Sequence, residues 1–258
     1  TELLGCAVGS PLAHHMHAST AAAKAVRKLD LIARMGEEHG HSALATMRFC
    51  GGFAMCGHLL RSGGPFPEMD MVDAATLRAF QSVAVPCTGD AWEQAQLPLR
   101  LGGFGIRPLH TYAAPAAFAS AFTSAAAAAN FYTGPDLPAD PLIASSQAAI
   151  TAALPTLVDT VGAIQRGEVA TDGKVQRLLS RAFDEHIADV LLEGARMENT
   201  TTAARLQSVR GDYASAWLGV HDTAAAPWLS NAEFRTACRL RLGLPVCPAA
   251  SVCGLCGA

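Results

Sequence analysis

Apolar residues recur at intervals of three and four along most of this chain, which is the spacing of amphipathic helices. Ser10 and Pro11 form a helix start and Gly36 a helix stop, so one helix is predicted from there to about Met35. A capping box, Ser230–Glu233, opens the last predicted helix. Further helices are predicted over residues 42–60, 69–85, 88–96, 113–130, 140–153, 155–166 and 172–197. The pattern therefore predicts a mainly α fold, a multi-helix bundle or array.

The predicted helix over residues 42–60 is apolar on almost every side, including Phe49 and Phe53. A helix without a polar face belongs in a protein core, so we expect this one to be the most buried element of the first half. No uninterrupted apolar run in the chain reaches the ~18 residues that span a bilayer. The sequence therefore predicts no membrane partner.

Two stretches depart from the helical pattern. Residues 97–107 alternate apolar and polar positions, the period of a half-buried strand, and Gly102 and Gly103 can supply a tight turn. This predicts a short β-hairpin-like stretch with Pro98 on an edge. The alternative is a glycine-rich link between two helical halves. Near the start, the apolar run Leu3–Gly9 is consistent with a buried strand.

Composition restricts the function classes. Net charge is −3, whereas a free-standing nucleic-acid-binding domain is usually clearly basic, so any such role needs a local patch. Eight cysteines at irregular spacings, without a secretion signal, favour a reducing compartment, either nuclear or cytoplasmic. The chain opens without a Met or a basic leader, which suggests a fragment of a longer protein.

Basic side chains gather in three places. Arginine is favoured over lysine, and its planar guanidinium matches phosphate oxygens, so these groups point to phosphate contact. The alternative is that they are solvated helix faces. The candidates are Arg100 and Arg107 beside the central glycines, Lys174, Arg177 and Arg181 at i, i+3 and i+7 on the helix predicted over 172–197, and Arg235, Arg239 and Arg241 on the last helix.

Groups that would carry catalysis are missing from the sequence. No Asp-Asp pair occurs to hold two metal ions, and Asp70 and Asp73 are explained by capping at a helix start. His14 and His17 share a helix face and could bind a metal as a pair, but the neighbouring sequence offers no acidic or Cys partner at metal spacing. Exposed histidines at a helix start are the alternative.

Cys253 and Cys256 form a C-x2-C pair on a glycine-flanked loop, which is half of a tetrahedral zinc site. The printed sequence ends two residues later, so we expect this chain alone to hold zinc poorly. Cys247 could supply a third thiolate at an unusual spacing.

Taken in order, eight segments resemble the C-terminal part of non-LTR (LINE-like) retrotransposon reverse transcriptases. They are "LLGCAVGS", "FCGGFAMCGHLLR", "EQAQLPLRLGGFGIRP", "APAAFASAF", "KVQRLLS", "RLQS…ASAWL", "NAEFRTACRLRLGLPV" and "CGLC". The resemblance implies the end of a palm-like strand at 1–10, a thumb-like helical bundle at 11–96, a strand or turn connector at 97–107, a post-thumb helical region at 108–245 and a truncated zinc-knuckle-like tail at 246–258.

In that family the thumb grips the template–primer duplex, and a Cys-Cys-His-Cys knuckle follows, whose first two ligands match Cys253 and Cys256. The resemblance implies a non-catalytic fragment of an RNA-directed DNA polymerase, with the catalytic aspartates upstream of Thr1 and zinc bound in the full-length parent. We expect weak, sequence-tolerant contact with the backbone of an RNA or DNA duplex, in company with the rest of the polymerase. The alternative is a helical protein-interaction module, or a decayed remnant that binds no nucleic acid.

Overall fold

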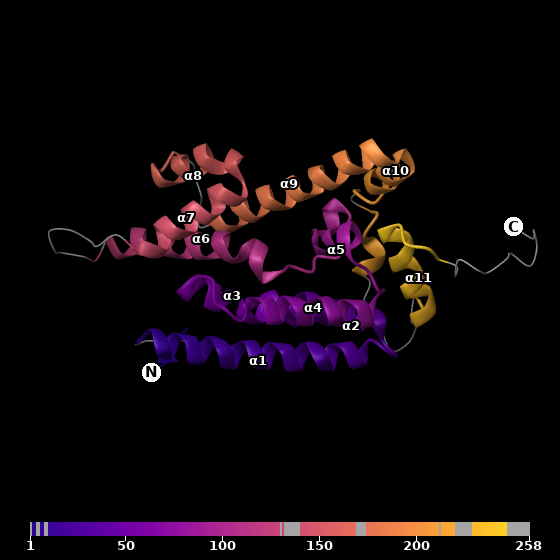
Figure 1. Cartoon of the computed structure of the whole chain (residues 1–258), viewed down its shortest axis with the longest axis horizontal. Coiled ribbons are helices and arrows are strands. Elements are labelled where there is room, and N and C mark those ends of the chain that lie inside the picture. Colours follow the sequence, from indigo (N-terminus) through magenta and orange to yellow (C-terminus); the bar gives the residue numbers. More distant parts are fainter. Residues whose placement is uncertain are drawn as a thin grey trace, which may run out of the picture. The chain divides into compact units, whose positions relative to one another are not determined.

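A computed structural model describes residues 2–3, 6–7, 10–129, 131, 140–168, 174–211, 213–219 and 229–246. Within these residues the chain is mainly helical, as predicted, and the helices are labelled in chain order in Figure 1. The first helix, α1 (Pro11–Met35), has the predicted bounds. Ala22 and Leu29 are fully buried on its core face.

Most of the other helices lie where the sequence predicted them, with shifted ends, but α10 (Thr200–Ser208) was not predicted. The helices are α2 (Gly40–Cys50), α3 (Gly52–Gly63), α4 (Met69–Val83), α5 (Gly89–Gln96), α6 (Leu109–Ala129), α7 (Pro141–Ala153), α8 (Val158–Gln165), α9 (Val175–Glu198), α10 (Thr200–Ser208) and α11 (Asn231–Leu242). Short 3-10 turns are η1 (Leu99–Leu101), η2 (Pro155–Leu157) and η3 (Ala216–Leu218). Two strands, β1 (Glu2–Leu3) and β2 (Cys6–Ala7), pair antiparallel, with Glu2 opposite Ala7 and Leu3 opposite Cys6.

The described residues form two compact units, each assembled from three segments of the chain. The first unit contains Thr1–Asp30, Arg48–Thr76 and Arg107–His186, and the second contains Leu31–Met47, Leu77–Ile106 and Ile187–Ala258. Each unit thus takes segments from before and after the central glycines. The predicted division into thumb-like and post-thumb parts concerns descent, and it stays a prediction.

In the first unit, α6 packs against both α3 and α7. Alanine dominates α6, and its small side chains let neighbouring backbones approach closely. Leu179 and Phe183 of α9 join this core. The other core residues of this cluster are Phe118, Ala119, Ile150, Leu154, Leu157, Val161, Ile164 and Val175.

The helix predicted over residues 42–60 is two helices, because the chain bends at Gly51 between α2 and α3. A Cβ on Gly52 would lie 2.7 Å from Oγ1 of Thr76 on α4, so the close approach of α3 and α4 requires glycine there. Burial is uneven along this stretch: Phe49 is 65% exposed and Phe53 is half-buried. The prediction that both phenylalanines are core residues is therefore wrong for Phe49.

By length and composition, the stretch Gly40–Gly63 is apolar enough to cross a membrane, although the sequence analysis did not single it out. Half of its most apolar window is buried inside the structure. Core helices of soluble proteins pass the same test.

The β-hairpin predicted over residues 97–107 is wrong. The segment forms the turn η1, followed by Gly102 in the left-handed region at φ 87°. Its amide donors return to nearby carbonyls, with the Phe104 amide bonding to Ala95 (2.9 Å) and the Gly105 amide to Leu97 (2.8 Å). A Cβ on Gly103 would lie 2.0 Å from the Leu97 oxygen, so the turn closes only over glycine.

The second unit is built around this turn. Leu97 packs with residues of α9 and α10, namely Ala188, Leu191, Leu192, Ala195, Ala203 and Leu206. On the other side of the turn, the Phe104 ring lies 5.4 Å from that of Phe80, centroid to centroid. Residues 97–107 are thus a core turn within the second unit.

Candidate nucleic-acid interface

Three basic side chains lie on one exposed face of α9. Lys174 immediately precedes the helix, and Arg177 and Arg181 follow it at i+3 and i+7. The opposite face carries Leu179 and Phe183 into the core of the first unit. Because that burial fixes the rotation of the helix, the three basic side chains face solvent. We call Lys174, Arg177 and Arg181 the α9 basic face.

Two of the three charges on this face are unengaged. Within the described residues, the side chains of Lys174 and Arg177 have no ion-pair or hydrogen-bond partner. Arg181 Nε donates to Oε1 of Glu185 at 2.8 Å, and this hydrogen bond raises the pKa of Arg181. Both partners are substantially exposed, so water and salt weaken the pair. A phosphate group can therefore compete with Glu185 for Arg181.

Arg61 adds a fourth cation beside the first turn of α9. It lies in the last turn of α3, is exposed, and donates from Nε to Oε1 of Gln176 at 3.0 Å. Gln176 is the direct sequence neighbour of Arg177. The sequence analysis missed Arg61, because this contact joins positions 115 residues apart and no local pattern announces it.

The two candidates beside the central glycines have different surroundings. Arg100 is exposed on the turn η1. Arg107 is half-buried, and its guanidinium lies 5.0 Å from the centroid of the Tyr112 ring. This cation–π contact explains the position of Arg107 without a ligand. Neither residue is joined to the α9 basic face by a described contact.

Arg235 and Arg239 of α11 make hydrogen bonds within the protein. Arg235 is half-buried and donates to the Ser82 carbonyl at 2.7 Å. Arg239 donates to the Pro245 carbonyl at 3.0 Å, beyond the end of its own helix. A guanidinium near a helix C-terminus also opposes the negative end of the helix dipole. The placement of both residues thus follows from contacts within the second unit.

Arg241, one of the sequence candidates for phosphate contact, is a core residue. It is 4% exposed. Its guanidinium donates to the carbonyls of Gly103 (3.1 and 3.3 Å), Ala214 (2.9 Å) and Leu99 (3.2 Å), and to the Ser215 hydroxyl (2.6 Å). These carbonyls belong largely to the turn that was predicted as a hairpin, so Arg241 supplies donors that a second strand would otherwise supply.

Burial lowers the pKa of the Arg241 guanidinium to about 10, so the group is still charged at neutral pH. A buried charge is tolerated only when its hydrogen bonds are made, and here carbonyl oxygens accept them. Gln94 and Arg205 extend the network: Gln94 Nε2 donates to the carbonyl of Arg241 (3.1 Å) and Arg205 donates to Oε1 of Gln94 (2.9 Å). The result is a hydrogen-bonded network within the second unit that joins Gln94, Arg205 and Arg241.

A second basic cluster, which the sequence analysis also missed, lies on α1. Lys24, Arg27 and Lys28 are exposed at i, i+3 and i+4, opposite the buried residues Ala22 and Leu29. The same spacing rule that found the α9 basic face would have found this one. It carries the same number of positive charges and provides a matched comparison.

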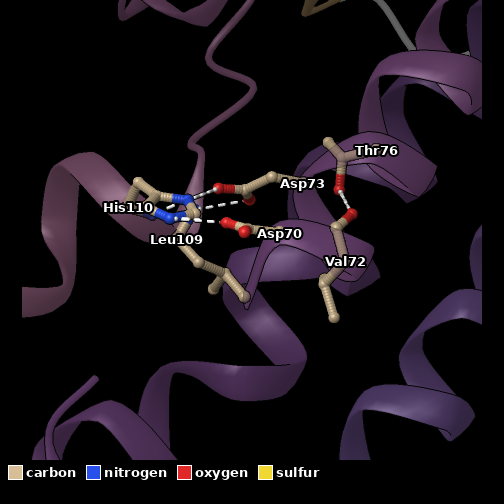
Figure 2. A network of polar contacts seen from close by, with 6 residues as sticks. All are labelled: Asp70, Val72, Asp73, Thr76, Leu109 and His110. Carbon is tan, nitrogen blue, oxygen red and sulfur yellow. Dashed lines mark hydrogen bonds and ion pairs between the residues drawn. The ribbon is translucent and has the colours of Figure 1, made fainter. Parts of the chain in front are cut away.

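The carboxylates of Asp70 and Asp73 on α4 contact the first residues of α6. Figure 2 shows the His110 ring between Asp70 and Asp73, with Nε2 of His110 2.8 Å from Asp70 and Nδ1 2.8 Å from Asp73. Asp73 also accepts the backbone N–H groups of Leu109 (2.7 Å) and His110 (3.1 Å). The sequence analysis predicted a capping role for these aspartates, but Asp73 caps the start of α6 and not its own helix.

Neither a metal site nor a similarity to a known protein adds a residue to the candidate interface in the part of the chain that the structure describes. Among the described residues, no group of three or more His, Cys, Asp or Glu side chains is placed to hold a metal ion. Cys253 and Cys256 lie outside the described residues. Comparison with known proteins finds no matching family model, no matching curated protein and no matching solved structure.

Proposed function

We propose that this chain is a non-catalytic C-terminal part of a reverse transcriptase of the non-LTR retrotransposon type, and that it contacts nucleic-acid backbones through the α9 basic face. The eight sequence segments, which occur in the same order as in that family, support the proposed relationship to it. The observation that carries the contact is the exposure of Lys174, Arg177 and Arg181 on one helix face, with Lys174 and Arg177 unengaged among the described residues.

The dimensions suit a phosphate backbone. From Lys174 to Arg181 the helix rises about 10 Å. One strand of a duplex presents about three phosphates over that length along its axis. Contacts with phosphates do not distinguish one base sequence from another, so the binding is sequence-tolerant. With a net charge of −3, the chain gains affinity only where its positive charges cluster, so binding is weak and falls steeply with salt.

The competing function is a helical protein-interaction module, or a remnant without nucleic-acid binding. A module of that kind would retain no duplex affinity that depends on the α9 basic face. Polymerase activity belongs, in our proposal, to a longer protein that carries paired catalytic carboxylates, because no Asp-Asp pair occurs in this sequence.

Charge reversal of the whole α9 basic face tests the proposal. We expect Lys174→Glu/Arg177→Glu/Arg181→Glu to lower affinity for a blunt duplex at least tenfold at low salt. The slope of log affinity against log salt should become shallower by about 0.9 for each lost phosphate contact. Fluorescence anisotropy over a salt series measures both quantities.

The matched control reverses Lys24, Arg27 and Lys28 on α1, which changes net charge by the same amount. Circular dichroism should show both triple variants folded, since all six side chains are exposed. Equal losses in the two variants would mean that net charge alone drives binding, and the assignment to α9 would be wrong. Unchanged affinity in the α9 variant would favour the interaction module.

A further inference from the structure

A pocket of about 300 Å³ opens in the first unit, between the start of α1 and the segment that follows α3. Three histidines of α1, namely His14, His15 and His17, line one side. Residues 62–67, including Phe66, line another. We call this cavity the His14 pocket. No part of the sequence analysis predicted it, because its two sides are far apart in the chain.

The walls of the His14 pocket contain several side-chain rings, four of them aromatic and two of them proline rings. Three imidazoles face it, together with the phenyl ring of Phe66 and the pyrrolidine rings of Pro65 and Pro67. Unpaired nucleobases bind proteins by stacking on such rings, with His and Phe among the usual partners. The volume of about 300 Å³ lies at the lower limit for small-molecule sites and is large enough for one planar base.

The polar groups of the His14 pocket include hydrogen-bond acceptors. Ser62 lines it, and the hydroxyl hydrogen of Ser62 is directed to the Leu59 carbonyl at 3.2 Å, which leaves oxygen lone pairs free to accept. The last turn of α3 ends here, and the final carbonyls of a helix lack partners within the helix. The exocyclic amino groups of adenine, cytosine and guanine are matching donors.

The ring of His15 lies next to the carboxylate of Glu68. Nδ1 of His15 lies 3.5 Å from Oε1 of Glu68, and the Ser19 hydroxyl donates to the same oxygen. The other carboxylate oxygen of Glu68, Oε2, is buried and has no hydrogen-bond partner among the described residues. Glu68 directly follows Pro67 of the pocket wall. The Glu68 carboxylate thus lies beside one imidazole of the pocket.

The last turn of α3 connects the His14 pocket with the basic residues of α9. Arg61 reaches Gln176 in the first turn of α9, while its neighbours Ser62 and Gly63 line the pocket. Consecutive Cα atoms are about 3.8 Å apart, so a cation and a base-sized cavity are adjacent on one helix end. A nucleic-acid strand whose phosphate contacts Arg61 has an unpaired base within reach of the pocket.

We propose that the His14 pocket binds one unpaired nucleobase of the nucleic acid whose backbone contacts Arg61 and the α9 basic face. This inference rests on the proposed function and names its preferred ligand: a duplex with a single-stranded overhang. The base stacks between the rings and donates its amino hydrogens to the acceptors at the end of α3.

A substitution that fills the cavity tests the proposal. Gly63 lines the His14 pocket, and a Cβ at this position meets no atom within 4 Å, so Gly63→Leu adds bulk from an open position on the pocket wall. Gly194→Leu is the matched control, because Gly194 is also a helical glycine with open space around its Cβ and does not line the pocket. The full chain is titrated with three short duplexes, which carry a normal overhang, an abasic overhang or blunt ends.

We expect the wild-type chain to bind the normal overhang about tenfold more tightly than the abasic one, which is the usual size of one stacking contact. Gly63→Leu should bind both overhangs equally and keep its affinity for the blunt duplex. Gly194→Leu should behave like the wild type.

The outcomes separate this inference from the proposed function. If the wild type binds the duplexes but does not distinguish the two overhangs, the inference fails alone. If charge reversal of the α9 basic face changes neither the duplex affinity nor the base preference, the pocket proposal stands and the assignment of the backbone contact to that face is refuted. A loss of base preference in Gly194→Leu, or stoichiometric zinc bound by the wild type and lost in His14→Ala, would also overturn the pocket proposal.

Discussion

The arginines of α11 and the basic residues of α9 are similar in sequence but have opposite surroundings. On α11, Arg241 is buried and donates only to groups of its own protein. On α9, Arg177 is exposed and its side chain has no partner among the described residues. The same side chain thus stabilises a turn in one region and remains available for a ligand in the other.

Helical periodicity explains the difference. Phe234 and Cys238 are fully buried on α11, and Arg241 follows Phe234 at i+7 and Cys238 at i+3, so it lies on the core face of that helix. On α9, the core face carries Leu179 and Phe183, and Arg177 and Arg181 lie on the other side. Counting arginines on a helix is therefore less informative than asking which face each of them occupies.

The largest expected effect follows from removing the buried guanidinium. Arg241→Ala leaves the carbonyls of Gly103 and Ala214 without this donor, whereas the Leu99 carbonyl still accepts from the Ser215 hydroxyl (2.9 Å). Each unsatisfied buried acceptor costs roughly 1–3 kcal/mol, so we expect a loss of about 3–5 kcal/mol in the free energy of unfolding. Urea denaturation followed by circular dichroism measures it.

Arg241→Lys refines this test, because lysine keeps the charge and loses the planar fork. We expect a free energy of unfolding between those of the wild type and Arg241→Ala. A stability of Arg241→Ala within about 0.5 kcal/mol of the wild type, the range of ordinary surface substitutions, would show that the carbonyls of the turn need no donor from α11.

Arg235 should give an intermediate effect. It is half-buried, and its donors reach the carbonyls of Ser82 (2.7 Å) and Gly36 (3.4 Å), so Arg235→Ala removes one good contact and one long one. We expect a loss of about 1–2 kcal/mol, again from urea denaturation. Nucleic-acid affinity should not change. A drop in duplex affinity without any loss of stability would return Arg235 to the binding surface.

Local patterns in the sequence predicted the regular parts of the fold. Ser10, Pro11 and Gly36 placed both ends of α1 correctly, and the capping box at Ser230 placed the start of α11, where Glu233 accepts from Ser230. These hydrogen bonds lower the pKa of Glu233. Caps are formed by side chains within a few residues of the helix end, which is why a single sequence reveals them.

Contacts between distant segments were out of reach. Residues 97–107 alternate like a strand, but the donors that satisfy the turn come from Arg241, more than 130 residues later. The bend at Gly51 reflects the close approach of Thr76 to Gly52. For the candidate site, the spacing of Lys174, Arg177 and Arg181 predicted their common face, whereas Arg61 and the His14 pocket depend on tertiary contacts alone.

The smallest expected effect on stability, and the sharpest contrast with Arg241, comes from Arg177→Ala. An exposed side chain without partners contributes little to folding, so we expect the free energy of unfolding to stay within about 0.5 kcal/mol of the wild type. Its phosphate contact should disappear, and the slope of log duplex affinity against log salt should become shallower by about 0.9. Arg78→Ala is the control, since Arg78 is exposed on α4 and likewise has no partner among the described residues. Equal slopes for Arg177→Ala and the wild type would mean that Arg177 is merely solvated, and the α9 basic face would lose its central member.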